Sequence, residues 1–347
     1  MFNYIDDILD SPIKIPDQSI GHSRNNRPIH AAVLGHGKIK ISLIGGCHAD
    51  EPVGPRFLRK LYSFLDSLEP SHNLIENYQW WIIPHANPDG EAVNKKWYTD
   101  DDMIFDIVNY LKSVVRELPG DDIEFGFPYD RGSPGLRPEN NAIYDFWVSA
   151  RTKFHLHASL HGMMMAGGPW FLLEKEWIDK SDIIQSLCRE EVTKMKYSLH
   201  DVDRKGEKGF QRIAEGFSTR PDSKAMRAFF MEQNNPEMAK KFFPSSMEAI
   251  RSLGGDPLTI VSEMPLFILP DLPPMLKWPH PVWEKWHAKL QDWKNRIRNN
   301  HDTDDKIRSE IKTSGIIPMP VNDQMRLQWR FITAPMAWGT DKALFNY

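Results

Sequence analysis

The sequence predicts an α/β fold: a mixed, mostly parallel twisted sheet with helices on both faces, forming a single large domain with an insertion. Three observations favour this class. Short β-branched and aromatic runs alternate along the chain with amphipathic helical patterns. The runs "KIKISLIGG" and "YQWWII" are apolar without a strict alternation, which is typical of strands buried on both faces. The 347 residues, 41% of them hydrophobic, are enough to fill one large core.

The elements of the first half follow from local patterns. The runs "RPIHAAVLG" and "KIKISLIGG" are separated by "HGK", and Gly35 and Gly37 predict a hairpin between two strands. Apolar residues recur at helical spacing from Pro55 to Leu68, which predicts an amphipathic helix on the sheet. The strand in "YQWWIIPHANPDG" ends in a loop, and helical patterns follow around residues 102–117 and 138–153.

The second half continues the alternation. "FHLHASLHGMMMAGGPWFLL" contains two strand-like runs, a helix is expected near residues 180–196, and "DPLTIVSEMPLFILP" is a further β-branched strand. We therefore expect an N-terminal segment, a main domain with a polar insertion, and a helical C-terminal extension packed on the core. These parts are residues 1–20, residues 21–277 with the insertion at 197–256, and residues 278–347.

Composition excludes several classes of function. The formal net charge is -4 and the basic residues form no arms or runs, so no nucleic-acid partner is expected. No apolar block approaches the ~18 residues of a membrane span, and the N-terminus lacks the basic segment of a signal peptide. Cys47 and Cys188 are expected to stay reduced. A cytoplasmic protein that acts on a small molecule or a peptide fits best, and the oligomeric state is left open.

His48 and Glu51 directly follow a predicted strand and could bind a metal together. A turn at a strand end lets an imidazole and a carboxylate point at one place, which suits zinc; a polar loop pair without a metal is the alternative. A catalytic zinc needs a third protein ligand, and His161 is the candidate because the strand in "FHLHASLHG" is expected to end there. His155 and His157 are expected to be partners within the sheet, but they remain rivals for the third ligand.

Glu263 is the one acid in the apolar run "LTIVSEMPLF". An unpaired carboxylate in such a strand is costly, so it either meets a counter-charge or faces a functional cavity. We expect a general base here, with a salt-bridged structural glutamate as the alternative.

The order of these motifs resembles that of the carboxypeptidase A-like zinc metallocarboxypeptidases, over roughly residues 21–270. The His-x-x-Glu pair, the "NPDG" turn, a Gly/Pro loop, a strand ending in His and a late strand with Glu follow the order of that family. By this resemblance His48, Glu51 and His161 match the ligands of one zinc ion per chain, and Glu263 matches the catalytic glutamate. The implied activity is hydrolysis of peptide or amide bonds by a zinc-activated water, with Glu263 as general base.

The resemblance also implies a cation for the oxyanion and an anchor for the substrate. The family places an arginine a few residues beyond the "NPDG" turn, where Lys96 is the nearest match and a solvated surface lysine is the alternative. The family's Asn-Arg pair, which binds the peptide's terminal carboxylate, corresponds here to Glu124 and Phe125. Arg131 and Arg137, in the following loop, are therefore the expected substrate-binding residues.

Two other functions are compatible with the same motifs. The aspartoacylase and succinylglutamate desuccinylase relatives share the zinc motif, so a deacylase of N-acyl amino acids is the alternative activity. A catalytically inactive binding protein of the same fold is less consistent with the retention of all three ligands and Glu263. With an acid at position 124, substrates with a free C-terminal carboxylate are expected to be poor. The insertion is expected to contribute contacts as a lid.

Overall fold

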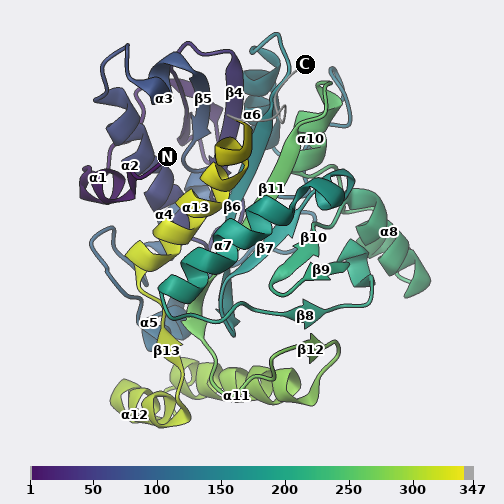
Figure 1. Ribbon diagram of the computed structural model, residues 1–347. Helices are drawn as coiled ribbons and strands as arrows, with labels where there is room; N and C mark the ends of the chain where they lie inside the picture. The colour runs from purple at the N-terminus through teal and green to yellow at the C-terminus, as the bar shows by residue number, and fades with distance from the viewer. Residues whose placement is uncertain (1, 340–347) are drawn as a thin grey trace.

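The fold is built around one mixed β-sheet. The structure is a computed structural model that describes residues 2–339. Within these residues nine strands form the sheet in Figure 1, in the order β3, β5, β4, β6, β11, β7, β10, β9, with β13 paired to β11. Their bounds are β3 (Ala32–Leu34), β4 (Ile39–Gly45), β5 (Tyr78–Ile83), β6 (Leu156–Ala166), β7 (Trp170–Leu173), β9 (Arg212–Ala214), β10 (Phe217–Thr219), β11 (Leu258–Ile268) and β13 (Ile317–Pro318).

The centre of the sheet is parallel and its flanks are mixed. β5, β4, β6 and β11 are parallel neighbours in turn. β3 is antiparallel to β5, β7 is antiparallel to β11, β10 is parallel to β7, and β9 is antiparallel to β10. Because parallel strands run in one direction, the segments that follow β4 and the carboxyl halves of β6 and β11 lie toward the same edge of the sheet.

Helices cover both faces of the sheet. On one face, α2 (Val53–Asp66), α7 (Asp182–Lys194) and α13 (Val321–Gly339) share a hydrophobic cluster with the strands (Figure 1). On the other face, α6 (Pro138–Val148) and α10 (Ser246–Ser252) belong to a second cluster. Leu43 and Ile44, neighbours in β4, lie in opposite clusters because successive side chains of a strand point to opposite faces. The predicted fold class is confirmed.

The other elements are short or lie at the ends of the chain. The helices are α1 (Ile5–Asp10), α3 (Asn73–Glu76), α4 (Pro88–Asn94), α5 (Ile107–Ser113), α8 (Ser223–Glu232), α9 (Pro236–Ala239), α11 (Pro281–Arg298) and α12 (Asp304–Ser314), with 3₁₀ turns at Lys175–Lys180 and Glu207–Gly209. β1 (Ser19–His22) pairs with β2 (Pro28–His30), and β8 (Val202–Asp203) pairs with β12 (Leu276–Lys277).

The predicted hairpin around Gly35 and Gly37 is wrong. β5 lies between β3 and β4 and pairs with both strands. The two glycines are needed for another reason: a Cβ at Gly35 would meet the carbonyl oxygen of Tyr78 at 2.2 Å, and a Cβ at Gly37 would meet the carbonyl carbon of Asn77 at 1.9 Å. The connection between the strands therefore packs on the start of β5, and glycine permits that close approach.

The segment predicted as an insertion contributes to the main sheet. Residues 197–256 contain β9 and β10, which extend the sheet beyond β7, and α10, which packs on the face that α6 also covers. Beyond residue 278, α11, α12 and α13 pack against the rest of the protein, with Trp293 and Phe331 fully buried.

Two further observations concern the thiols and the helices. Cys47 and Cys188 are both free and buried, in agreement with the expected reduced thiols. Within residues 2–339, the helices are too short or too polar to cross a membrane.

Candidate metal centre

The bend after β4 brings two polar side chains against the centre of the sheet. His48 and Glu51 lie between β4 and α2. Gly54, in the first turn of α2, allows this helix to approach β6, because a Cβ at Gly54 would meet the carbonyl oxygen of Leu160 at 2.6 Å. Leu160 directly precedes His161, so this close contact sets the spacing between Glu51 and His161.

The side chains of His48, Glu51 and His161 converge on one point. His48 Nδ1 lies 2.8 Å from Glu51 Oε1, His161 Nδ1 lies 2.9 Å from Glu51 Oε2, and the two Nδ1 atoms are 3.1 Å apart. Glu51 and His161 are buried, whereas His48 is partly exposed. The group is thus open to solvent on the side of His48.

This donor set fits a zinc ion. Two imidazole nitrogens and a carboxylate are a common set of protein ligands for catalytic zinc, with the fourth position left to water or substrate. Tetrahedral zinc with bonds of about 2.0–2.1 Å separates its donors by roughly 3.3 Å. The observed separations of 2.8, 2.9 and 3.1 Å are close to that value.

The charges around the group are strongly coupled. Burial disfavours the Glu51 carboxylate, but the charges of His48 and His161 outweigh it and hold the pKa of Glu51 well below its usual range. Burial also opposes the charged form of His161, yet Glu51 and Glu124 raise its pKa well above the usual value. A zinc ion bound here would take the place of the proton on His161 Nδ1 and stabilise the anionic Glu51.

Glu263 lies beside the group because of strand register. It pairs with His161 in the parallel ladder between β11 and β6, so the two side chains leave the sheet on the same face. Its side chain is partly buried. Burial raises the pKa of Glu263 to about 8, and the charge of Glu51 acts in the same direction, while His161 and Arg116 oppose the shift.

Arg116 is the cation that contacts this group, and the sequence did not reveal it. Its Nη1 donates to Glu51 Oε1 at 3.1 Å and to both oxygens of Asp50 at 3.1 and 3.3 Å, and its Nη2 lies 3.1 Å from His48 Nδ1. The helical pattern expected up to residue 117 concealed it. The helix α5 ends at Ser113, and the chain continues in an extended conformation.

The backbone next to Arg116 is held from α4. The Asn94 side chain donates to the carbonyl oxygen of Val115 at 2.8 Å and accepts from its N–H at 3.0 Å. Asn87, of the "NPDG" turn, donates to Glu117 Oε2 at 2.6 Å. Asn94 of α4 and Asn87 of the "NPDG" turn thus hold the residues on the two sides of Arg116.

The rival histidines of β6 are engaged elsewhere. His157 is fully buried, with Nδ1 3.0 Å from Ser42 Oγ and Nε2 3.3 Å from Ser246 Oγ. His155 Nδ1 accepts from the backbone N–H of Lys40 at 3.0 Å. The strand does not end at His161 as expected: β6 continues to Ala166, because its parallel pairing with β11 extends that far.

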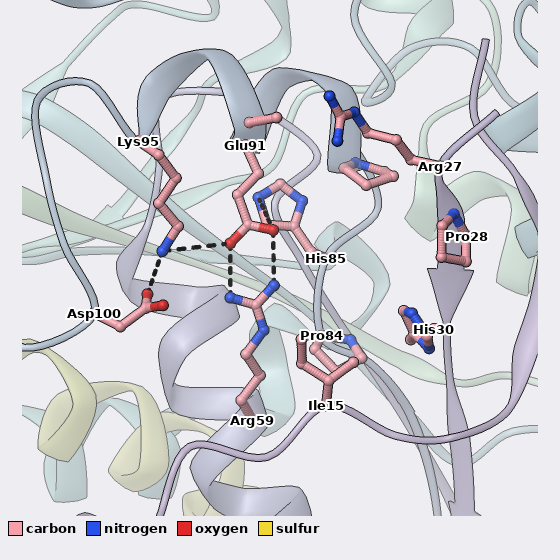
Figure 2. Close-up of a pocket in the computed structure, with 12 residues that line it drawn as sticks. Ile15, Arg27, Pro28, His30, Arg59, Pro84, His85, Glu91, Lys95 and Asp100 are labelled. Atoms are coloured by element: carbon pink, nitrogen blue, oxygen red, sulfur yellow. Dashed lines mark hydrogen bonds and ion pairs between the residues drawn. The ribbon is translucent and has the colours of Figure 1, made fainter. Parts of the chain in front are cut away.

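Lys96 is exposed just beyond α4, and the structure does not bring it into contact with the three candidate ligands. Its neighbour Lys95 is directed to Glu91 and Asp100, in a cavity of about 350 Å³ (Figure 2). There Arg59 makes two hydrogen bonds of 2.7 Å to Glu91. Arg59, Glu91, Lys95 and Asp100 in this cavity are thus paired with one another.

Arg131 and Arg137 also lie apart from the three candidate ligands. Arg131 is exposed and lines a different cavity, of about 760 Å³, together with Lys153 and Leu253. Lys153 precedes β6 and Leu253 precedes β11, so this cavity lies toward the amino ends of the strands. His161 and Glu263 belong to their middle and carboxyl parts.

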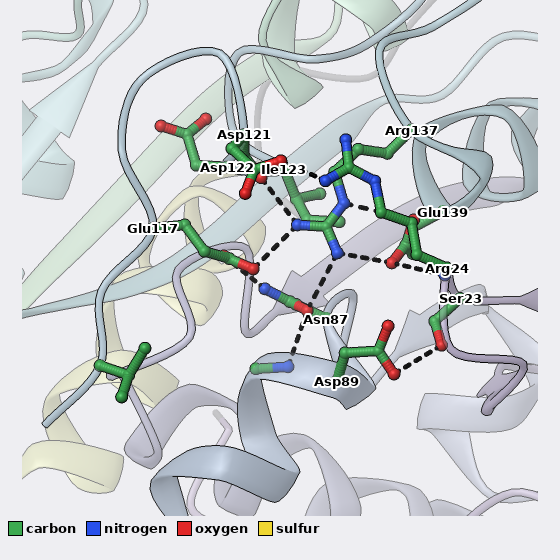
Figure 3. Close-up of polar contacts among 12 residues, drawn as sticks. Ser23, Arg24, Asn87, Asp89, Glu117, Asp121, Asp122, Ile123, Arg137 and Glu139 are labelled. Carbon is green, nitrogen blue, oxygen red and sulfur yellow. Dashed lines mark hydrogen bonds and ion pairs between the residues drawn. The ribbon is translucent and has the colours of Figure 1, made fainter. Parts of the chain in front are cut away.

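Arg137 is buried within a network of hydrogen bonds (Figure 3). Its guanidinium donates to both oxygens of Glu139 at 2.6 and 3.3 Å, to Glu117 at 2.9 Å, to the carbonyl oxygen of Asp121 at 2.7 Å and to Asn87 at 3.5 Å. These five bonds equal the number of N–H groups that a guanidinium carries. The structure therefore gives Arg137 internal partners for its whole donor set.

Comparison with known proteins identifies the family. A family model described as zinc carboxypeptidase matches residues 2–243, more than half of the chain. The chain belongs to the zinc carboxypeptidase family. This membership confirms the resemblance seen in the sequence, and zinc, which the family description names, is the metal that the donor set fits. Glu263 lies beyond the matched residues, so its role is argued from its position in the sheet.

Individual relatives cover smaller parts of the chain. Carboxypeptidase SOL1 of Arabidopsis thaliana is 29% identical over 163 residues, which are 44% of this chain and 30% of that protein. Zinc carboxypeptidase A 1 of Anopheles gambiae is 34% identical over 85 residues, 22% of this chain and 20% of that protein. The chain thus spans less than a third of the length of these curated relatives.

A metallo-carboxypeptidase from Burkholderia cenocepacia is similar in structure with a TM-score of 0.47 and 12% identity, covering 98% of this chain and 68% of the other. Carboxypeptidase A from Helicoverpa armigera gives a TM-score of 0.44 and 13% identity, covering 86% of this chain and 71% of the other.

Proposed function

We propose that the protein is a zinc-dependent hydrolase of peptide or amide bonds, with His48, Glu51 and His161 as the zinc ligands. The observation that carries this proposal is the convergence of two Nδ1 atoms and a carboxylate, at separations of 2.8 to 3.1 Å, beside Glu263. Zinc held there supplies a Lewis acid for the scissile carbonyl and lowers the pKa of water. Family membership supports this choice of metal and reaction.

Glu263 is proposed as the group that moves the proton. Its carboxylate accepts a proton from the attacking water, the water oxygen bonds to the carbonyl carbon, and the same proton passes to the leaving nitrogen as the C–N bond breaks. Burial and the neighbouring charge of Glu51 raise the pKa of Glu263, so its carboxylate is a stronger base than that of a free glutamate.

Arg116 is proposed as the cation that stabilises the oxyanion. Its guanidinium touches two of the three proposed ligands, and its side chain is about half exposed, with 47% of its surface accessible. It can therefore reach both the metal ligands and a substrate oxygen. Asn94 and Asn87 hold the neighbouring residues, so the charge is positioned before the substrate arrives.

The substrate is proposed to be a peptide or amide that does not depend on the family's usual carboxylate anchor. The resemblance places Glu124 and Phe125 where that anchor belongs. Phe125 packs edge-on against Phe242, with ring centroids 5.3 Å apart, so this part of the loop is apolar rather than cationic. Arg137 is saturated by internal bonds and Arg131 lies toward the other end of the strands. A free terminal carboxylate therefore lacks a dedicated guanidinium here.

The test is zinc analysis combined with a hydrolysis panel. We expect one zinc per chain in the purified protein and loss of that zinc in His161→Ala but not in His157→Ala. The panel compares peptides with free and amidated C-termini, N-acyl amino acids and peptidoglycan fragments. Cleavage of amidated or modified peptides supports the proposal. Activity confined to N-acyl amino acids would instead select the deacylase alternative, and zinc binding without hydrolysis of any class would indicate a binding protein.

A further inference from the structure

Behind the metal-facing side of His161 lies a second group of polar side chains. Since His161 Nδ1 faces Glu51 and His48, the other ring nitrogen, Nε2, points the opposite way. There it lies 2.8 Å from Ser159 Oγ and 3.2 Å from Glu124 Oε2. Cys47 belongs to the same group. A histidine that binds a metal through Nδ1 carries its proton on Nε2. Ser159 Oγ lies at hydrogen-bond geometry from that nitrogen, and the Glu124 carboxylate lies beside it as a second, charged acceptor that a small rotation would align.

The carboxylate of Glu124 is buried and has few other polar contacts. The residue is only 4% exposed, and neither carboxylate oxygen makes a hydrogen bond of standard geometry within residues 2–339. A buried carboxylate without a partner is strongly disfavoured, because its lost hydration is not replaced. The N–H of His161 and the weaker thiol donor of Cys47 are the donors beside it, and Glu124 is too deeply buried to meet a substrate.

The backbone around Glu124 is fixed from several directions. The carbonyl oxygen of Ile123 accepts from the Asn140 side chain at 2.8 Å. The N–H of Phe125 donates to Asp122 at 3.2 Å, and its carbonyl oxygen accepts from the N–H of Phe243 at 3.0 Å. The residues on both sides are held, so the carboxylate has a defined direction toward the ring.

We propose that Glu124 is a positioning residue for the metal centre: it accepts the Nε2 hydrogen bond of His161, fixes the ring so that the Nδ1 lone pair faces the metal, and strengthens metal binding. This inference rests on the proposed zinc site. It also changes the expectation for the substrate, because the acid at position 124 turns away from the pocket and toward a ligand. Poor cleavage of free-carboxylate substrates would then result from the missing guanidinium, not from repulsion by this acid.

The experiment is a measurement of the zinc dissociation constant, by chelator competition, in Glu124→Gln and Glu124→Ala. Outer hydrogen bonds to metal-bound histidines are worth about 10–100-fold in metal affinity. We expect about 10-fold weaker zinc binding in Glu124→Gln, which keeps a neutral acceptor, and up to about 100-fold in Glu124→Ala. Substitution with Co²⁺ adds a second readout, since loss of the hydrogen bond should shift the visible absorption bands. If Glu124→Ala does not fold, the zinc dissociation constant of Glu124→Gln, which preserves the side-chain volume, decides whether the inference holds.

A matched control separates positioning from general damage. Glu174 is 5% exposed, and its carboxylate bonds Arg220 and Thr259 instead of a proposed ligand. Glu174→Gln should lower the unfolding midpoint but leave the zinc dissociation constant unchanged. Wild-type zinc affinity in both Glu124 variants would overturn the inference and leave the proposed zinc site standing. Two zinc ions per chain, one lost with Cys47→Ala, would overturn it in favour of a second metal site. Absence of zinc binding by the wild type, or wild-type affinity in His161→Ala, would overturn the proposed function as well.

Discussion

Arg137 and Glu263 belong to two buried polar groups that differ in how well their charges are matched. Around Arg137, five hydrogen bonds satisfy the guanidinium, and two of its partners are carboxylates (Figure 3). Around the metal centre, burial raises the pKa of Glu263 to about 8, and the Glu124 carboxylate lies against the His161 ring and the Cys47 thiol without a hydrogen bond of standard geometry within residues 2–339. The group around Arg137 can therefore stabilise the fold without a bound ligand. In the unmatched group, burial of Glu263 outweighs the opposing charges of His161 and Arg116, which is typical of a site that binds or reacts.

The largest effect is expected at Glu263, in the unmatched group. Glu263→Gln should reduce hydrolysis by about 10²–10⁴-fold, because the amide cannot accept the proton of the attacking water. Zinc content should stay at one per chain. Since burial already disfavours the carboxylate, the neutral amide should not lower the free energy of unfolding. Loss of zinc would instead make Glu263 a ligand, and a loss of stability with unchanged turnover would make it a structural residue.

Arg137, in the matched group, should show the opposite pattern. Arg137→Met leaves Glu139 buried without its counter-charge, which costs about 3–5 kcal/mol of unfolding free energy. Chemical denaturation measures this loss, and Arg137→Met with Glu139→Gln should recover part of it. A raised KM with unchanged stability would contradict the comparison and restore Arg137 as a substrate-binding residue.

Arg116 tests whether the cation beside the unmatched group serves catalysis. Arg116→Ala should lower kcat by about 10²–10³-fold, the usual loss for one oxyanion donor. Lys96→Ala and Arg131→Ala are the controls, and both should change stability by less than about 0.5 kcal/mol and leave kcat unaffected. A large loss in Lys96→Ala with normal turnover in Arg116→Ala would reverse the assignment.

The smallest effect is expected at His157, whose two ring nitrogens each lie within hydrogen-bond distance of a serine hydroxyl group. Burial lowers its pKa to about 3, from an ordinary value of 6.5. The unfolded chain therefore binds more protons than the folded one between these values, and stability falls as the pH is lowered through this window. Between pH 6.5 and 5.5 the contribution of His157 should be a loss of about 1 kcal/mol. His157→Gln should flatten this part of the stability profile, and an unchanged slope would show that another group is responsible.

The parts predicted from the sequence are those that depend on local chemistry. The run from Gly45 to Glu51 predicts a metal site from the sequence alone, because a strand, a turn and two metal-binding side chain types occur within a few residues. His161 was proposed because its strand was expected to end there, although β6 continues to Ala166, and Glu263 because a carboxylate in an apolar strand needs a partner or a functional cavity. Only the structure shows that these two residues are paired in neighbouring strands, because strand pairing depends on segments far apart in the sequence.

The parts that were missed depend on contacts between distant segments. Arg116 looked like a surface residue of a helix, and only the bonds from Asn94 to Val115 show why the chain is extended there. Gly35 and Gly37 suit a hairpin turn and a close backbone approach equally well, so the sequence could not separate the two. Glu124 has the same charge whether it faces a substrate or a ligand, and its direction is set by Asn140 and Phe243.

The last helix has a consequence for how the protein is made on the ribosome. Trp329 of α13 stacks on Trp80 at 6.4 Å between ring centroids, lies 6.4 Å from the ring of Phe57, and donates to the carbonyl oxygen of Phe2 at 3.1 Å. When synthesis has reached the end of β11, the five residues proposed for the chemistry are all present. The apolar face formed by α2 and the neighbouring strands still lacks its cover at that point. The nascent chain therefore exposes this apolar surface until α13 has been made, and exposed apolar surface favours aggregation during that period.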